Sequence, residues 1–340
     1  MESQAGGVHP EPHKDLYFSD GDVILCASSV SAKKTFLLRV HKLLLSLHSP
    51  VFKDMFAFPT DPSVNETLDG IPVVRMPDDA EELATFITLF YKPLSLKRDM
   101  HGIVSRTVLR HLLSLASKYQ ADSIREEAVA ILTRAWPRTL SEWFVFRASM
   151  NQRIQTINHL DRDPWDDLPE KYFPEPVEDL RLAIDFEIHA IVPVIYYRLA
   201  ISDPLLKFGE DFTEPEQLSA NWKCLRADDW ERLIIGKERL YNSSHWLPVQ
   251  IPLIFPESSC KSRDVCTSVT VQLRDDLHHT FDAHYTRRPD FIGEVYDLLD
   301  TPQRWSGYCA VCAPSFIRLL KKSLHETWNT LSFTFDCNGE

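Results

Sequence analysis

Glycine is scarce in this chain, so few loops let the backbone approach a substrate or a phosphate closely. Only 10 of the 340 residues are Gly. The sequence also lacks the G-x-S-x-G, H-E-x-x-H, P-loop and G-x-G-x-x-G motifs, each of which places a reacting group, a metal or a phosphate at a defined turn or helix. These absences leave little support for catalysis, and we expect a protein that is not an enzyme.

Positive charge and long apolar runs are also in short supply. The 37 Lys and Arg are outnumbered by 49 Asp and Glu, and the net charge of −12 argues against nucleic acid as the main partner. The longest apolar stretch, residues 188–201, is too short to span a bilayer and contains His189, Pro193 and Arg198. The first 15 residues lack the apolar core of a secretory signal. We therefore expect an intracellular protein, cytoplasmic or nuclear, that does not bind membranes.

Cysteine is infrequent and odd in number, with seven residues. Thiols stay reduced inside the cell, so we expect no disulfide framework. The rest of the composition is that of a chain with a core: 44% of the residues are hydrophobic and 25% are charged. A length of 340 residues suffices for two domains.

The pattern of apolar residues changes its period between residues 20 and 56. Alternation over residues 23–28 and a β-type run over residues 35–40 predict two strands joined by a short polar loop. After them the spacing turns helical, and Leu43, Leu44 and Leu47 share one face that we expect to pack against the sheet. A second helix is predicted to start at Ser49-Pro50, because Ser accepts a free amide and Pro has none to lose.

The same kinds of signal continue to about residue 135. Residues 72–77 predict a third strand. Asp78, with Glu81 three residues later, has the spacing of a capping box and predicts the start of a helix that ends near Phe90-Tyr91. Residues 104–119 again have helical spacing.

This order of elements resembles a BTB/POZ domain of the fungal type, and the resemblance covers about the first 135 residues. It implies an α+β fold for residues 18–135, with a small, mostly three-stranded sheet covered by helices, after a disordered tail over residues 1–17. It also implies a protein-interaction module that forms a homodimer and docks a cullin scaffold in a ubiquitin ligase, or acts in a transcriptional complex. The residues that carry the resemblance are Asp22-Val23, residues 36–40, His41, Leu44, residues 49–52, Met55-Phe56, Phe90-Tyr91 and residues 112–120.

Asp22 and His41 each have two interpretations. The resemblance implies that Asp22 belongs either to a charged cleft at the dimer surface or to the edge of the first strand. His41 stands where a strand gives way to a helix. A metal or catalytic role is conceivable there, but we expect a buried histidine that fixes the junction through hydrogen bonds.

The chain changes character after Trp136. Residues 136–255 are predicted to be mainly helical and resemble the region that follows BTB domains in many fungal proteins. Within them, residues 161–176 are rich in acids and proline, which is typical of a solvated loop. Residues 256–340 carry most of the remaining cysteines and are predicted to form a small cysteine module.

Four of these cysteines have spacings typical of a metal site. Cys309 and Cys312 are separated by two residues, and Cys260 and Cys266 supply a second pair. Two such pairs provide the four thiolates of a structural zinc site. Three alternatives remain open: four free or buried thiols, ligation by His278 or His279, and a thiol-redox enzyme that uses the Cys309/Cys312 pair.

Overall fold

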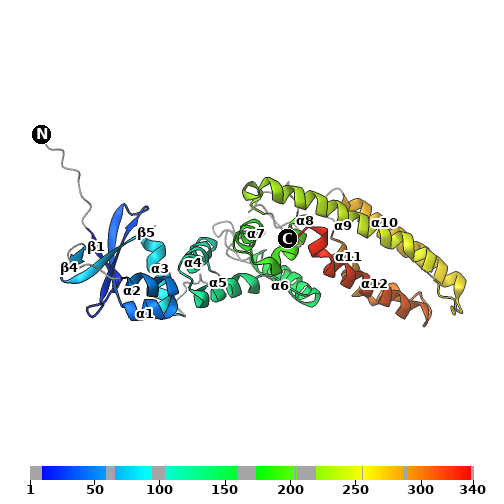
Figure 1. Ribbon diagram of the computed structural model, residues 1–340. Helices are drawn as coiled ribbons and strands as arrows, with labels where there is room; N and C mark the ends of the chain where they lie inside the picture. Colours follow the sequence, from blue (N-terminus) through cyan, green and yellow to red (C-terminus); the bar gives the residue numbers. More distant parts are fainter. Residues whose placement is uncertain are drawn as a thin grey trace. The chain divides into compact units, whose positions relative to one another are not determined.

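The chain divides into two compact units, residues 1–132 and residues 133–340, both drawn in Figure 1. Each unit is described by itself. Residues 1–9 and 161–173, for which we predicted a tail and an acidic loop, lie outside the described residues. The computed structural model describes residues 10–58, 66–93, 104–158, 174–202, 204, 220–254, 256–285 and 290–337, and of residues 244–254 and 278–285 the backbone alone.

A five-stranded sheet forms one layer of the first unit, with the strand order β1-β3-β2-β5-β4 (Figure 1). β2 and β3 form an antiparallel hairpin in which Val23 lies opposite Val40, and β5 runs parallel to β2. These are the three predicted strands. The bounds are Glu11–Tyr17 for β1, Val23–Ser29 for β2, Lys34–Val40 for β3, Thr67–Leu68 for β4 and Ile71–Asp79 for β5.

The prediction of a disordered tail over residues 1–17 was wrong for residues 11–17. They form β1, which pairs parallel to β3 at the edge of the sheet. Leu16 is the buried residue of this strand, and Lys34 of β3 lies 3.0 Å from the Glu11 carboxylate. An edge strand with one buried side chain shows no apolar alternation, so its sequence resembles a polar tail.

The described residues of the BTB-like part form five helices, and aromatic rings fill the space between them. Phe52 stacks on Tyr119 with ring centroids 4.5 Å apart, and Phe86 lies 5.8 Å from the same tyrosine. All three rings are at least 98% buried. The helices are α1 Lys42–His48, α2 Pro50–Ala57, α3 Ala80–Tyr91, α4 Arg106–Lys118 and α5 Asp122–Arg134.

Caps were predicted for α2 and α3, and the cap of α3 was assigned to the wrong residue. Ser49 caps α2 as predicted, since its hydroxyl accepts a bond from the Phe52 amide at 3.1 Å. The cap of α3, however, is Asp79, which accepts from the amide of Glu81. Asp78 instead binds the ammonium of Lys118 and the hydroxyl of Tyr119. Of the two neighbouring aspartates, Asp79 therefore caps its own helix, whereas Asp78 connects to the end of α4.

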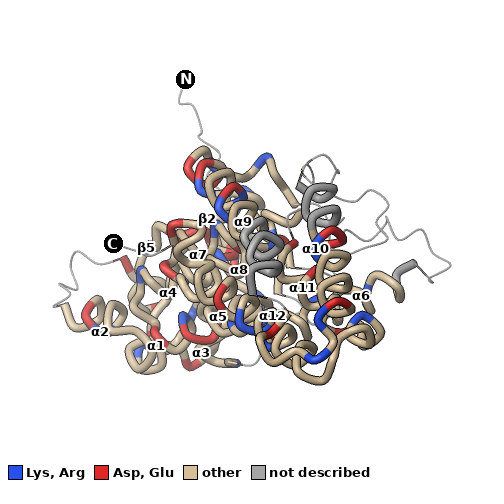
Figure 2. Tube along the Cα trace, turned by 90° about the vertical axis from the view of Figure 1, so that its right-hand side faces the viewer, with Lys and Arg blue, Asp and Glu red and all other residues tan. Residues whose placement is uncertain are grey.

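The described residues of the second unit form helices joined by turns and short non-helical segments, with no strand among them, as predicted for the C-terminal region. None of its described helices, or of those in the first unit, is long and apolar enough to cross a bilayer. Acidic and basic residues are interspersed along the helices (Figure 2). The main helices are α6 Leu140–Asn158, α7 Pro176–Asp185, α8 Val192–Ala200, α9 Ala227–Ile254, α10 Arg263–Tyr285, α11 Phe291–Leu299, α12 Cys312–Asn329 and α13 Leu331–Thr334, with short turns η3 His189–Ile191, η5 Trp222–Cys224 and η6 Pro302–Trp305.

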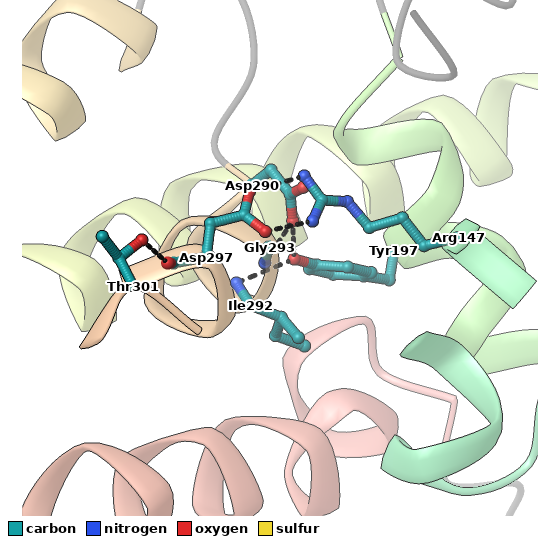
Figure 3. A network of polar contacts seen from close by, with 7 residues as sticks. All are labelled: Arg147, Tyr197, Asp290, Ile292, Gly293, Asp297 and Thr301. Carbon is teal, nitrogen blue, oxygen red and sulfur yellow. Dashed lines mark hydrogen bonds and ion pairs between the residues drawn. The ribbon is translucent and has the colours of Figure 1, made fainter. Parts of the chain in front are cut away.

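Buried polar bonds connect α8 to the start of α11 in this unit (Figure 3). The hydroxyl of Tyr197 donates to Asp290 at 2.6 Å, and the same carboxylate caps α11 by accepting from the Gly293 amide at 2.9 Å. Burial raises the pKa of Tyr197, so its hydroxyl keeps the proton that it donates. Arg147 of α6 adds a bidentate pair with Asp297 of α11, at 2.8 and 2.9 Å. These bonds fix three helices whose sequence positions are far apart.

Candidate metal centre

The structure brings together the four cysteines whose spacing predicted a metal site. The sulfur atoms of Cys260, Cys266, Cys309 and Cys312 all lie within 4.8 Å of one another. Cys266 stands in the first turn of α10 and Cys312 is the first residue of α12. Cys260 and Cys309 belong to the non-helical segments that lead into these two helices. The start of each helix thus contributes one pair of ligands.

The sulfur positions fit a tetrahedral metal ion. A Zn–S bond of about 2.3 Å places two sulfurs of a tetrahedron about 3.8 Å apart. The Cys260 and Cys309 sulfurs are 3.7 Å apart. All seven cysteines of the described residues are free thiols, and none of the four in the cluster is joined in a disulfide. Four sulfurs in this geometry are typical of a zinc or iron–sulfur site.

Local packing explains why the turn before α12 reaches α10. Trp305, Tyr308 and Phe316 form an aromatic cluster, with centroids 5.7 Å apart for Trp305 and Phe316 and 5.6 Å apart for Tyr308 and Phe316. Gly307 allows the close approach, because a Cβ at this position would lie 2.8 Å from a methyl group of Val269 in α10. This packing lets the Cys309 amide donate to the Cys266 sulfur at 3.4 Å.

The four thiols differ in acidity because their surroundings differ. The backbone amides of Cys312 and Val311 point at Cys309 and lower its pKa to about 6. Burial has the opposite effect on its neighbours: it raises the pKa of Cys312 to about 12 and also raises that of Cys266. Cys309 therefore ionises more readily than its neighbours, whereas the buried thiols need a cation close by before they ionise.

The structure bears in different ways on the predicted alternatives to a site with four cysteine ligands. The side chains of His278 and His279 lie outside the described residues. Cys224 and Cys337 do not belong to the sulfur cluster. In the Cys309/Cys312 pair, Cys312 is fully buried, so only one of its two sulfurs reaches solvent.

The structure places Asp22 and His41 at the junction between β3 and α1. The His41 amide donates to the hydroxyl of Tyr91 at 3.0 Å, and its Nδ1 lies 2.9 Å from the same oxygen. Asp22 is exposed, and its carboxylate accepts a 2.7 Å bond from the amide of Lys42 at the start of α1. Both side chains hold α1 in place, and His41 also joins it to the end of α3. His41 is half-buried, however, and not buried as we expected.

Sequence reasoning missed an exposed apolar pair on α1. We expected Leu43, Leu44 and Leu47 to pack against the sheet. Leu45 is the residue that is fully buried, whereas Leu43 is 81% exposed and Leu47 is 74% exposed. With only seven residues, α1 is too short for its apolar pattern to identify the buried side.

A scan against protein-family models matches residues 21–135 to the BTB/POZ domain. Residues 21–135 are a BTB/POZ domain. A search of curated proteins found no match.

The BTB/POZ domain is a protein-interaction family, so this part of the chain is a protein-interaction module. The matched residues include Asp22, His41 and the exposed leucines of α1. The cysteine cluster, at residues 260–312, lies outside the matched range. The candidate metal centre is therefore supported by its own geometry and not by the family match.

Proposed function

We propose that this chain is a non-enzymatic adaptor whose BTB/POZ domain pairs with a second copy, and whose C-terminal unit is held together by a structural zinc ion. The pairing surface includes α1, and the zinc ligands are Cys260, Cys266, Cys309 and Cys312. The adaptor serves a ubiquitin ligase through a cullin scaffold, or a transcriptional complex. BTB domains commonly dock cullin scaffolds or act in transcriptional complexes, and both roles are intracellular.

The exposed side of α1 carries the proposal of a dimer. Leu43 and Leu47 are four residues apart, so they lie on the same side of the helix. Burying a leucine side chain that is exposed in the monomer contributes about 2 kcal/mol. A two-fold axis at this helix would bring both leucines of each copy into one interface, because an isologous contact uses the same surface twice.

Sedimentation of the full chain at high micromolar concentration tests the dimer. We expect the unmodified chain to sediment as a dimer. The double variant Leu43→Asp/Leu47→Asp should weaken association by about a thousandfold or more, since charges replace buried apolar groups. Val30→Asp is the matched control, because Val30 is 83% exposed but lies in the turn after β2 and not in α1. A strict monomer of the unmodified chain would contradict the proposed pairing.

The four-sulfur geometry carries the proposal of zinc. Thiolate ligands suit Zn²⁺, and a closed set of four protein ligands is typical of a structural site, not a catalytic one. Elemental analysis of the purified chain should find about one zinc per chain. Co²⁺ in its place should give the absorption spectrum of tetrahedral thiolate coordination. Protein without metal whose Cys309/Cys312 pair cycles with a dithiol reductant would favour the rival thiol-redox function.

Partners of the C-terminal unit can be separated from those of the BTB/POZ domain by truncation. Affinity purification with the full chain and with residues 1–135 should recover overlapping sets of proteins. Those lost on truncation bind the C-terminal unit. The net charge of −12 leads us to expect proteins and no nucleic acid in that set.

A further inference from the structure

The four sulfurs of the cysteine cluster are not equally accessible. Cys266 and Cys312 have no exposed surface. Cys260 and Cys309 are half-buried, so a small reagent in solution reaches these two sulfurs first.

The two accessible sulfurs also lie next to each other. They are 3.7 Å apart, and a disulfide bond is about 2.05 Å long. The two sulfurs would therefore have to approach by about 1.7 Å in total to form the bond.

The accessible pair and the buried pair of cysteines also differ in their backbone structure. Cys266 and Cys312 stand in the first turns of α10 and α12, where helical hydrogen bonds fix the main chain. Cys260 lies in the segment between α9 and α10, and Cys309 in the turn between η6 and α12. Non-helical segments can absorb the small displacement that bond formation needs, whereas the helical pair cannot do so without breaking a first turn.

We propose that Cys260 and Cys309 are a peroxide-sensitive pair whose oxidation to a disulfide releases the metal. The proposal rests on the zinc site proposed above. It also differs from a redox enzyme that uses Cys309 with Cys312, because it assigns the reaction to the two sulfurs that solvent reaches.

The reaction requires hydrogen peroxide as the oxidant. One thiolate attacks a peroxide oxygen, the O–O bond breaks, and a sulfenic acid and hydroxide form. The second thiolate attacks that sulfur and expels the oxygen as a second hydroxide. Two electrons pass from the sulfur pair to the peroxide. With four protons from solvent, two for the hydroxides and two for the thiolates of Cys266 and Cys312, the products are one disulfide, two thiols, two waters and free Zn²⁺. The metal leaves because two buried cysteines cannot complete a tetrahedral site alone.

Oxidation would change the charge of the cysteine cluster but would keep the segment before α10 attached to the turn before α12. Four thiolates and one Zn²⁺ carry a formal double negative charge, whereas one disulfide and two thiols carry none. The new covalent bond would keep the segment before α10 attached to the turn before α12. The expected result is a change of charge and rigidity at the start of the two helices.

Peptide mapping of the zinc-loaded full chain tests the proposal. Zinc is first measured by elemental analysis, then the chain is treated with hydrogen peroxide while a chromogenic chelator records the released metal. Free thiols are alkylated and disulfides are mapped by mass spectrometry. We expect zinc release to follow the appearance of a Cys260–Cys309 disulfide, with Cys266 and Cys312 alkylated only after denaturation.

Two variants sharpen the test. Cys260→His retains a zinc ligand but cannot form the disulfide. Peroxide should therefore release zinc from this variant at least about tenfold more slowly. Cys224→Ser removes an exposed thiol outside the cluster and should leave the rate unchanged. A Cys309–Cys312 disulfide, or zinc retained under peroxide, would overturn this inference and leave the zinc site standing. A chain without zinc before treatment would overturn both.

Discussion

Ser49 shows how one side chain can serve two elements of the BTB/POZ domain. It is fully buried, accepts a bond from the Phe52 amide and donates one to the carbonyl of Tyr119 after α4. Ser49→Ala should therefore leave two buried backbone groups without this partner. We expect the free energy of unfolding to fall by about 2 kcal/mol, since both a cap and an interhelical bond are lost.

Urea unfolding of the full chain, combined with hydrogen exchange at the amides of α2, would measure this effect. Ser114→Ala is the matched control, because Ser114 lies on the exposed side of α4. The same chemical change there should alter stability by no more than about 0.5 kcal/mol. Equal effects at the two positions would show that the buried bonds of Ser49 contribute nothing.

Glu175 gives the second unit a predicted pH dependence. It is 1% exposed, and its carboxylate accepts bonds from the amides of Glu178 and Asn221 at 2.6 and 2.7 Å. Burial outweighs these bonds and raises its pKa to about 7. A raised pKa means that the folded state prefers the protonated form. Its contribution to stability is therefore complete below the unfolded value near 4.5 and is lost as the pH rises through 7.

The variant Glu175→Gln isolates this contribution, because a glutamine imitates the protonated acid at every pH. The stability of the unmodified chain relative to the variant should fall between pH 5 and pH 8, by an amount on the order of 3 kcal/mol. Thermal unfolding of both proteins across this range is the measurement. A constant difference would mean that Glu175 titrates near its ordinary value.

Residues with a local role were easier to predict than residues whose partners come from elsewhere in the chain. The cap at Ser49 follows from its own neighbours in sequence. Asp78 and Asp79 carry the same capping signal, and only the positions of Lys118 and Tyr119 decide which of the two caps α3. The four cysteines could be predicted from the sequence because metal ligands often come in closely spaced pairs. Their unequal exposure depends on the packing of α10 against the turn before α12, which spacing does not reveal.

At the scale of elements, a buried carboxylate joins three helices of the second unit. Asp229 in the first turn of α9 is 2% exposed. It accepts a 2.8 Å bond from Arg181 of α7 and a 3.0 Å bond from the hydroxyl of Tyr196 of α8. The residues next to Asp229 in the sequence give no sign of this interhelical role, because both of its partners come from other helices.

Asp229→Ala should destabilise this unit by about 3 kcal/mol or more, because it leaves the buried guanidinium of Arg181 with a weaker set of partners. Asp228→Ala is the matched control, since Asp228 is exposed in the same helical turn. Removing it should cost at most about 1 kcal/mol through the helix dipole. Denaturant unfolding would compare the two variants, and a similar cost for both would contradict a specific role for the buried acid.

The division of the chain into two units determines which part of it loses stability when the metal is removed. The chain divides after residue 132, and all four cysteines of the cluster belong to the second unit. If they hold zinc, the metal stabilises that unit by mass action, with about 4 kcal/mol gained when free zinc is a thousandfold above its dissociation constant. Chelation should therefore destabilise the second unit by at least this amount and leave the BTB/POZ domain unchanged.

Hydrogen exchange of the full chain before and after chelation separates the two units. We expect faster exchange at the amides of α10 and α12, and unchanged exchange in β2, β3 and α3. Cys224→Ser should respond as the unmodified chain does, because its sulfur is outside the cluster. Slower or unaltered exchange at the start of α12 would argue against a structural metal. Equal acceleration in the BTB/POZ sheet would mean instead that the two units unfold as one, so that the metal stabilises the whole chain.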